Sequence, residues 1–271
     1  MKQFIYIITE GVLDVVVLTQ VLQQRFSLDV VKRKSDLPKE AADWLGQFKW
    51  PVGEDIERLA VPAPAFLQNG NLIVGLRNAG GFQKISSTMN ADQEAFLRLQ
   101  WQPIATGIVL DADDQPPAKR FAEFADLLGK QHFPRPQTLD DVASANGLRA
   151  GVFAFPGQGS PGTLEDVLLP LAATRFPELW KHADQFVQDW LATDIANSGS
   201  DFKELRKLSG PKKARLSTMV ALLKPAKPLK ASIEDHRWFP DDMAVRSELN
   251  PLIEFLNKLF DSSSAERQPG T

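Results

Sequence analysis

The chain has 271 residues, enough for one large domain or a domain with an appendage, and its 43% hydrophobic and 24% charged residues are ordinary for a globular protein. Its formal net charge of -3 gives no support for gross attraction to nucleic acid. It has no cysteine, which excludes disulfides, thiolate zinc sites and cysteine nucleophiles, and its separated histidines, His132, His182 and His236, do not suggest an imidazole metal site or a Ser–His triad. With no signal-peptide pattern and no apolar run long enough to span a bilayer, we expect a cytoplasmic protein without a membrane partner.

The first third of the chain predicts strands that alternate with helices. Lys2–Thr9 is β-branched, aromatic and apolar almost throughout, as in a buried strand, and Glu10-Gly11 ends it. Val12–Phe26 then predicts a helix that is apolar on most sides and therefore packs against a sheet. Weaker patterns predict a strand at Leu28–Lys34, a short helix at Lys39–Phe48, a strand at Asn71–Arg77, a turn at Gly80-Gly81 and a helix at Ala91–Gln100.

The strongest strand pattern is Ile104–Asp114, which opens on apolar and β-branched residues and closes on acids, as expected of a buried strand in a parallel sheet. Pro116–Lys130 predicts an amphipathic helix, and Gly151–Phe155 predicts another strand, which leads into a glycine- and proline-rich loop and a helix. From Leu171 onwards the pattern is helical, with helices predicted at Phe176–Ala196, Lys212–Leu223 and Asn250–Phe260 and a frayed polar tail at Ser262–Thr271.

This alternation predicts an α/β fold in which helices flank a mostly parallel sheet. We expect residues 1–173 to form the α/β domain, with an elaboration around residues 28–100. Residues 174–271 are expected to form a helical C-terminal part that packs on it.

Acidic residues follow three of the predicted strands. They are Glu10 with Asp14 one helical turn later, then Asp111, Asp113 and Asp114, and then Glu165 with Asp166. Because parallel strands end at one edge of a sheet, we expect the three groups to meet.

Structural explanations cover part of this set. Asp14 suits the positive end of a helix dipole, Asp114 suits an Asx turn, and Asp166 resembles the acid of a capping box. They do not account for Glu10, because glutamate is a poor N-cap, or for Asp111, which directly ends an apolar strand.

Carboxylates held together repel one another unless a cation or a proton lies between them. Mg²⁺ binds a few carboxylates while it keeps waters and substrate phosphates as its other ligands, and Mn²⁺ suits the same oxygens. The sequence therefore predicts a carboxylate cage for one or two Mg²⁺ (or Mn²⁺) ions, of the kind that serves phosphoryl transfer.

The order of these motifs resembles the Toprim domain of topoisomerases, bacterial primases and nucleases of the overcoming-lysogenization-defect type. The motifs are Ile8-Thr9-Glu10-Gly11 with Asp14 following, then Val109-Leu110-Asp111-Ala112-Asp113, and then Gly162-Thr163-Leu164-Glu165-Asp166, which is similar to a subgroup of stand-alone bacterial Toprim-like proteins. The resemblance covers about Lys2–Ala173. Two departures are the apolar Val12, where the family often has a polar residue, and the long spacing between Glu10 and Asp111.

The resemblance implies a Toprim-like, Rossmann-like sheet with Glu10, Asp111 and Asp113 as catalytic residues and Mg²⁺ ligands. Glu10 would also act as a general acid or base, Asp14 would join the metal site, and Glu165 with Asp166 would be accessory ligands. It implies a nuclease that cleaves DNA or RNA, similar to effectors of bacterial anti-phage defence that work beside a partner ATPase. The chain has no G-x-x-x-x-G-K-[ST] motif, so energy-coupled gating would need that partner.

Basic residues are the candidates for holding a phosphate. Lys212, Lys213 and Arg215 begin a predicted helix, although a solvated helix face explains them as well, and Lys84 follows the Gly80-Gly81 turn.

Two other functions stay open at this point. A non-catalytic interaction protein would keep the fold and use the acids only for stability, as the acidic balance favours. A primase-like nucleotidyl transferase would share the site, but the chain has no zinc-binding element of the kind that accompanies primases.

Overall fold

The computed structural model describes residues 2–48, 53, 54, 56, 63–113, 116–236, 238, 239 and 248–260. Within these residues seven strands form one sheet in the order β2-β3-β4-β1-β5-β7-β6. The strands are β1 Gln3–Thr9, β2 Asp29–Val30, β3 Ala65–Gln68, β4 Leu72–Asn78, β5 Ala105–Asp111, β6 Val142–Ala145 and β7 Leu148–Phe155. The four central strands β4, β1, β5 and β7 are parallel, while β2, β3 and β6 join the two edges antiparallel.

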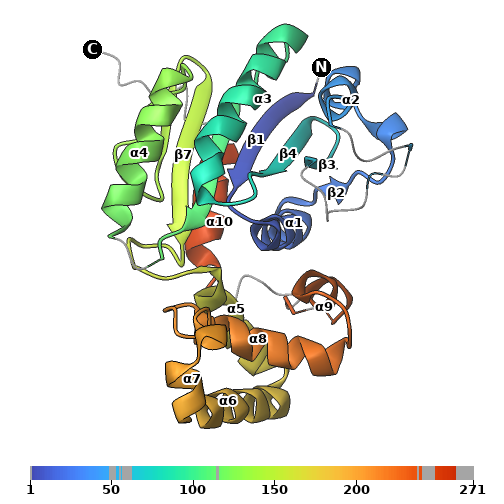
Figure 1. Ribbon diagram of the computed structural model, residues 1–271. Helices are drawn as coiled ribbons and strands as arrows, with labels where there is room; N and C mark the ends of the chain where they lie inside the picture. Colours follow the sequence, from blue (N-terminus) through green and yellow to red (C-terminus); the bar gives the residue numbers. More distant parts are fainter. Residues whose placement is uncertain are drawn as a thin grey trace.

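Helices cover both faces of this sheet (Figure 1). The helices are α1 Val12–Phe26, α2 Lys39–Leu45, α3 Ile85–Leu99, α4 Pro117–Lys130, α5 Leu164–Arg175, α6 Pro177–Leu191, α7 Asp194–Ser198, α8 Gly210–Leu223, α9 Leu229–His236 and α10 Asn250–Phe260, with short 3-10 helices η1 Lys34–Asp36, η2 Phe82–Lys84 and η3 Ser200–Phe202. An α/β fold with helices flanking a mostly parallel sheet is therefore confirmed.

Alternation along the strands builds two cores. In β1, Ile5 and Ile7 face the core that contains α1, α5 and α10, whereas Phe4, Tyr6 and Ile8 face the core that contains α2, α3 and α4. Successive side chains of a strand point to opposite faces, and a strand covered on both sides is apolar throughout.

The last helix, α10, packs closely on the sheet over two glycines. A Cβ added to Gly107 would lie 3.0 Å from Leu259, and one added to Gly151 would lie 2.6 Å from Phe255 and 2.7 Å from the backbone oxygen of Asp141. The Arg149 guanidinium also donates to the backbone oxygen of Leu259 at 2.7 Å. Glycine at these two strand positions therefore allows the helix backbone to approach the sheet.

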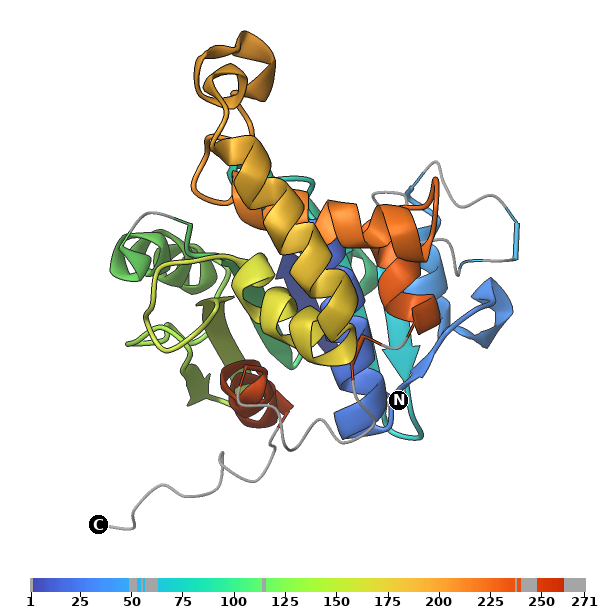
Figure 2. The same ribbon diagram turned by 90° about the horizontal axis from the view of Figure 1, so that it is seen from below.

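Helices α5 to α9 form a layer beyond the carboxyl ends of the parallel strands, as Figures 1 and 2 show. Lys212 of α8 bonds Asp166 of α5 at 2.6 Å, and Arg215 of α8 bonds Asp184 of α6 at 2.5 Å. These ion pairs fix the start of α8 near the edge of the sheet where β1, β5 and β7 end.

The structure confirms most of the predicted elements and corrects others. The helices Val12–Phe26 and Asn250–Phe260 have the predicted bounds. The Leu28–Lys34 strand is wrong beyond the two residues of β2, and the helix predicted at Phe176–Ala196 divides into α6 and α7. Strands β3 and β6 and helix α9 were not predicted, because each is short and lies among prolines or polar residues. Asp114 and the tail Ser262–Thr271 lie outside the described residues.

Candidate functional site

Three acidic segments meet where the parallel strands β1, β5 and β7 end. Thr9 of β1 pairs with Val109 of β5, and Asp111 of β5 pairs with Phe155 of β7. The backbone N–H of Glu10 continues this pairing by donating to Val109 at 3.2 Å. Glu10, Asp111 and the start of α5 are therefore neighbours, although Glu10 and Leu164 are 154 positions apart in the chain.

Glu10 carries its carboxylate in a half-buried position next to Asp111. The backbone N–H of Asp111 donates to this carboxylate, while its other oxygen, Oε2, is buried without a hydrogen-bond partner in the described structure. Burial raises the pKa of Glu10, and the negative charge of Asp113 raises it further. A buried oxygen without a partner is costly, so this atom is suited to binding a proton or a cation.

Asp111 joins the end of β5 to the start of α5. Its Oδ1 accepts the backbone N–H of Leu164 at 2.8 Å, which is one of the free donors of the first helical turn. Burial, together with the charges of Asp14 and Glu165, raises the pKa of Asp111 to about 9. Without a cation this group holds a proton at neutral pH.

Asp14 lies in the first turn of α1, the helix that follows Glu10. Its Oδ2 accepts the backbone N–H of Gly11 at 2.6 Å, and the residue is only 5% exposed. Burial, and then the charges of Glu10 and Glu165, raise the pKa of Asp14 to about 7. Asp14 therefore caps α1, in addition to the favourable helix-dipole position expected from the sequence, and it contributes charge to the cluster.

Glu165 is a second acid with an unpaired oxygen. It is buried in the first turn of α5, and its Oε2 has no hydrogen-bond partner among the described residues. Its Oε1 lies 4.0 Å from the ammonium of Lys213 in α8, the side chain of which is 58% exposed. The helical layer thus brings the Lys213 ammonium close to the carboxylates.

Asp113 lies at the outer side of the cluster and bonds a cation that the sequence pattern did not indicate. The guanidinium of Arg120 donates to Asp113 Oδ2 at 2.9 Å and stacks on the Phe82 ring at 3.8 Å. The backbone of Asp113 pairs with Gly162 in both directions, at 2.7 and 2.9 Å. In the sequence, the only indication of Arg120 was a basic residue in the helix that follows the acidic strand.

The structure gives three predicted residues other partners. Asp166 accepts the backbone N–H of Thr163 at 2.9 Å, so it caps α5, and both of its oxygens bond Lys212. Arg215 is engaged with Asp184 inside the helical layer. These contacts give Asp166, Lys212 and Arg215 protein partners in the folded chain, and their assignment as metal and phosphate ligands stays a prediction.

Lys84 is exposed at the end of η2, the same short helix that carries Phe82.

In this partly buried site the charges of Glu10 and Glu165 therefore raise the pKa of both Asp14 and Asp111. Among the described residues, no three Asp, Glu or His side chains already stand as a set of ligands around one point. The two unpaired oxygens and the raised pKa values nevertheless fit a hard divalent cation, because such an ion would relieve repulsion that protons otherwise relieve. The amino ends of α1 and α5 also point their dipoles at this charge.

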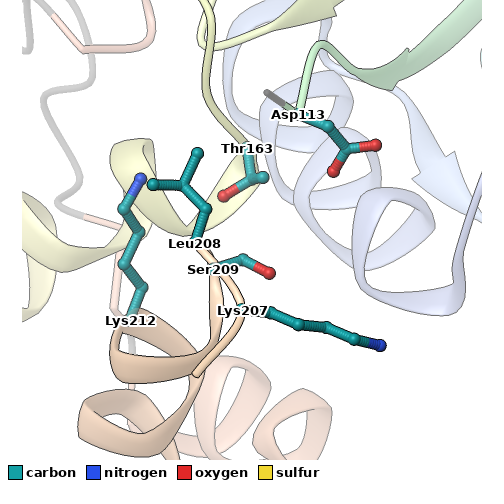
Figure 3. A pocket seen from close by; sticks show the side chains of 6 residues that line it. All are labelled: Asp113, Thr163, Lys207, Leu208, Ser209 and Lys212. Carbon is teal, nitrogen blue, oxygen red and sulfur yellow. The ribbon is translucent and has the colours of Figure 1, made fainter. Parts of the chain in front are cut away.

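Two pockets separate this edge of the sheet from the helical layer. One, of about 250 Å³, is lined by Asp113 and Thr163 on one side and by Lys207, Leu208, Ser209 and Lys212 on the other, as Figure 3 shows. In that view the Lys212 side chain extends upward from α8, and the Lys207 side chain extends to the right, away from Lys212. The second, of about 440 Å³, adds Lys213 to Asp113, Lys207 and Ser209. Lys207, Leu208 and Ser209 were not predicted, because only the tertiary fold brings them to this edge.

No described helix has the length and apolar character that crossing a bilayer requires. A crystal structure of a hypothetical protein from Pyrococcus horikoshii OT3 is similar in fold, with a TM-score of 0.50 and 18% identity over 95% of each chain. No curated protein matches the sequence. Residues 6–261 match the profile of the family described as "Protein of unknown function (DUF3226)", so the chain belongs to the DUF3226 family.

Proposed function

We propose that this protein is a Mg²⁺-dependent nuclease with a Toprim-like site that cleaves nucleic-acid phosphodiesters. The observation that carries the proposal is the pair of buried, unpaired oxygens, Glu10 Oε2 and Glu165 Oε2, beside Asp111 with its raised pKa. A stable fold does not need three such acids at one edge of a sheet, because their burial and repulsion cost free energy.

Glu10, Asp111 and Glu165 would hold the ion, with Asp14 behind them and Asp113 at the outer side. The ion would supply Lewis-acid stabilisation of the phosphate and an activated water. Glu10, whose pKa is raised, is suited to accept a proton from the attacking water. Arg120 holds Asp113 in place, and Lys213 supplies positive charge from the helical layer.

Thermal unfolding with and without Mg²⁺ or Mn²⁺ tests the ion site. A ligand present at 100 times its Kd stabilises a folded protein by about 2.7 kcal/mol, so saturating Mg²⁺ should raise the melting temperature of the wild type. Glu10→Gln should lose this rise. Glu94→Gln, which removes an exposed glutamate on α3, should keep it.

Cleavage of labelled DNA and RNA with Mg²⁺ or Mn²⁺ tests the chemistry. We expect product with the wild type and with Glu94→Gln, and at least about a hundredfold less with Glu10→Gln, since loss of a general base typically costs 10²–10⁴. If the wild type and Glu10→Gln are equally inert with every substrate, with any partner ATPase supplied, the nuclease proposal is wrong.

A non-catalytic interaction protein is the second candidate, and one observation favours it. Asp14 and Asp111 each accept a backbone N–H at a helix start, which is a structural use of an acid. On this alternative, divalent ions should leave the melting temperature unchanged at all pH values where the protein is folded.

A further inference from the structure

A row of pockets follows the edge of the sheet where the acids lie. Asp113 lines the two pockets next to α8, of about 250 and 440 Å³, and its ion-pair partner Arg120 lines another of about 370 Å³. Phe82, Lys119 and Glu123 line this last pocket with Arg120. The Asp113–Arg120 pair therefore stands between pockets on the helical-layer side and a pocket on the α4 side.

Exposed cations lie at both ends of this row. Lys207 and Lys213 line the pockets next to α8, with side chains that are 57% and 58% exposed, and Lys119 lines the pocket beside α4. Lys207 bonds Glu204 at 2.7 Å, but this pair is exposed and such pairs contribute little, so the ammonium can exchange its partner. The three pockets are lined by five basic residues and three acidic ones, which is a local excess of positive charge on a chain whose net charge is -3. The basic residues are Lys119, Arg120, Lys207, Lys212 and Lys213, and the acidic ones are Asp113, Glu123 and Glu204.

Apolar side chains accompany these cations. Leu208 is 64% exposed although it is large and apolar, and it lines the 250 Å³ pocket directly beside Lys207. At the other end the Phe82 ring lies under the Arg120 guanidinium, 3.8 Å from its centre. Cations interleaved with aromatic or apolar surfaces are typical of sites that bind unpaired bases and their backbone.

The helical layer limits what can enter the row. The Lys212–Asp166 ion pair ties α8 to α5, so the pockets next to α8 are bounded on two sides. Their volumes, about 250 and 440 Å³, lie at the small end of the scale for small-molecule sites and suit one nucleotide at a time. A duplex carries its bases inside and is stiff, whereas a single strand can bend and insert its bases.

We propose that this row, from Lys207 and Leu208 past Asp113 and Arg120 to Phe82 and Lys119, is a binding path for single-stranded nucleic acid. The inference deepens the proposed nuclease function and rests on it for the role of the acids. It makes a separate claim about the substrate, namely that single strands bind and duplexes are excluded.

Fluorescence anisotropy of the full chain in Ca²⁺ buffer tests the path, with a labelled 20-nucleotide thymidine strand and a blunt hairpin duplex as probes. We expect the strand to bind at least about ten times more tightly than the duplex. Lys119→Gln and Lys207→Gln should each weaken the strand several-fold and lower the slope of log K against log salt by about 0.7, the value for one phosphate contact on a single strand. Leu208→Ala should weaken binding without changing this slope.

Matched controls lie elsewhere on the same helices. Lys130 is an exposed lysine at the opposite end of α4 from Lys119. Leu222 is an exposed leucine at the end of α8, whereas Leu208 lies just before that helix begins. Lys130→Gln and Leu222→Ala should bind like the wild type. Equal binding of strand and duplex, absence of strand binding, or equal losses in the control variants would each overturn the inference.

The binding result is independent of cleavage. If the protein binds single strands and the variants behave as expected, but nothing is cleaved in Mg²⁺ or Mn²⁺, the binding path is supported and the nuclease proposal is wrong. If the protein cleaves duplexes as well as single strands, the nuclease proposal is supported and the binding path is wrong.

Discussion

The acid cluster should make the metal-free protein less stable as the pH rises, and Asp111→Asn should remove much of this effect. The folded-state pKa of Asp111 is raised to about 9. An unfolded aspartate has a pKa of about 3.9. Between these values the folded state binds one proton more than the unfolded state. The free energy of unfolding is therefore highest below about pH 4, as far as Asp111 determines it, and it falls until about pH 9.

The size of the effect follows from the proton count. One extra bound proton lowers the free energy of unfolding by about 1.4 kcal/mol for each pH unit, so Asp111 alone should cost about 3 kcal/mol between pH 5 and pH 7. For a chain of this size that is roughly 6 to 12 °C in melting temperature. Asp14, with a pKa of about 7, adds to the same slope below neutrality.

Differential scanning calorimetry in chelator-treated buffer from pH 5 to pH 8 measures this slope. Asn at position 111 keeps an oxygen that can accept the Leu164 N–H, so the variant should have a shallower slope and exceed the wild type in stability at pH 8. Asp43→Asn, an exposed position on α2, should keep the wild-type slope. Saturating Mg²⁺ should flatten the wild-type profile by replacing the proton. A wild-type stability that is constant or rises from pH 5 to pH 7 would refute this account of the cluster.

Two further predictions concern the scaffold. Gly151→Ala places a Cβ 2.6 Å from Phe255 and should destabilise the protein by about 1–3 kcal/mol in urea unfolding, whereas Gly129→Ala on α4, with open space around it, should be neutral or stabilising by up to about 1 kcal/mol. Arg77→Met leaves the buried Asp92 without the guanidinium that bonds it at 3.1 Å, and should cost about 3–5 kcal/mol; a loss below about 1 kcal/mol would contradict a structural role for that pair.

Local sequence pattern was sufficient for much of the fold. β1, α1 and α10 have one continuous apolar or amphipathic pattern each, and their bounds were predicted within a residue or two. β3 has four residues and joins the sheet antiparallel to β4, so its position depends on pairing rather than on its own pattern. Short elements of this kind are determined by tertiary contacts, which a single sequence does not reveal.

The candidate site was predictable to the same extent. Glu10 and Asp111 could be placed together because both end neighbouring parallel strands, a rule that needs only the strand order. Arg120 and Lys207 could not be placed near these acids from the sequence, because their positions depend on the rotation of α4 and on how the helical layer packs against the sheet. The packing of the helical layer also pairs Arg215 with Asp184, a contact that the sequence pattern did not indicate.

The return of α10 to the sheet has a consequence for how the molecule can be divided. After β7 the chain runs through α5 to α9 in residues 164–239, and it then comes back to contribute a core helix over Gly107 and Gly151. The helical layer is thus an insertion held at both ends, not a tail. Removing everything after α5 would strip the sheet of α10, whereas a linker that joins the end of α5 to Asn250 would keep both α5 and α10 on the sheet. Two anchored ends also restrict the layer to movements that leave both attachments in place, such as rotation about the line between them.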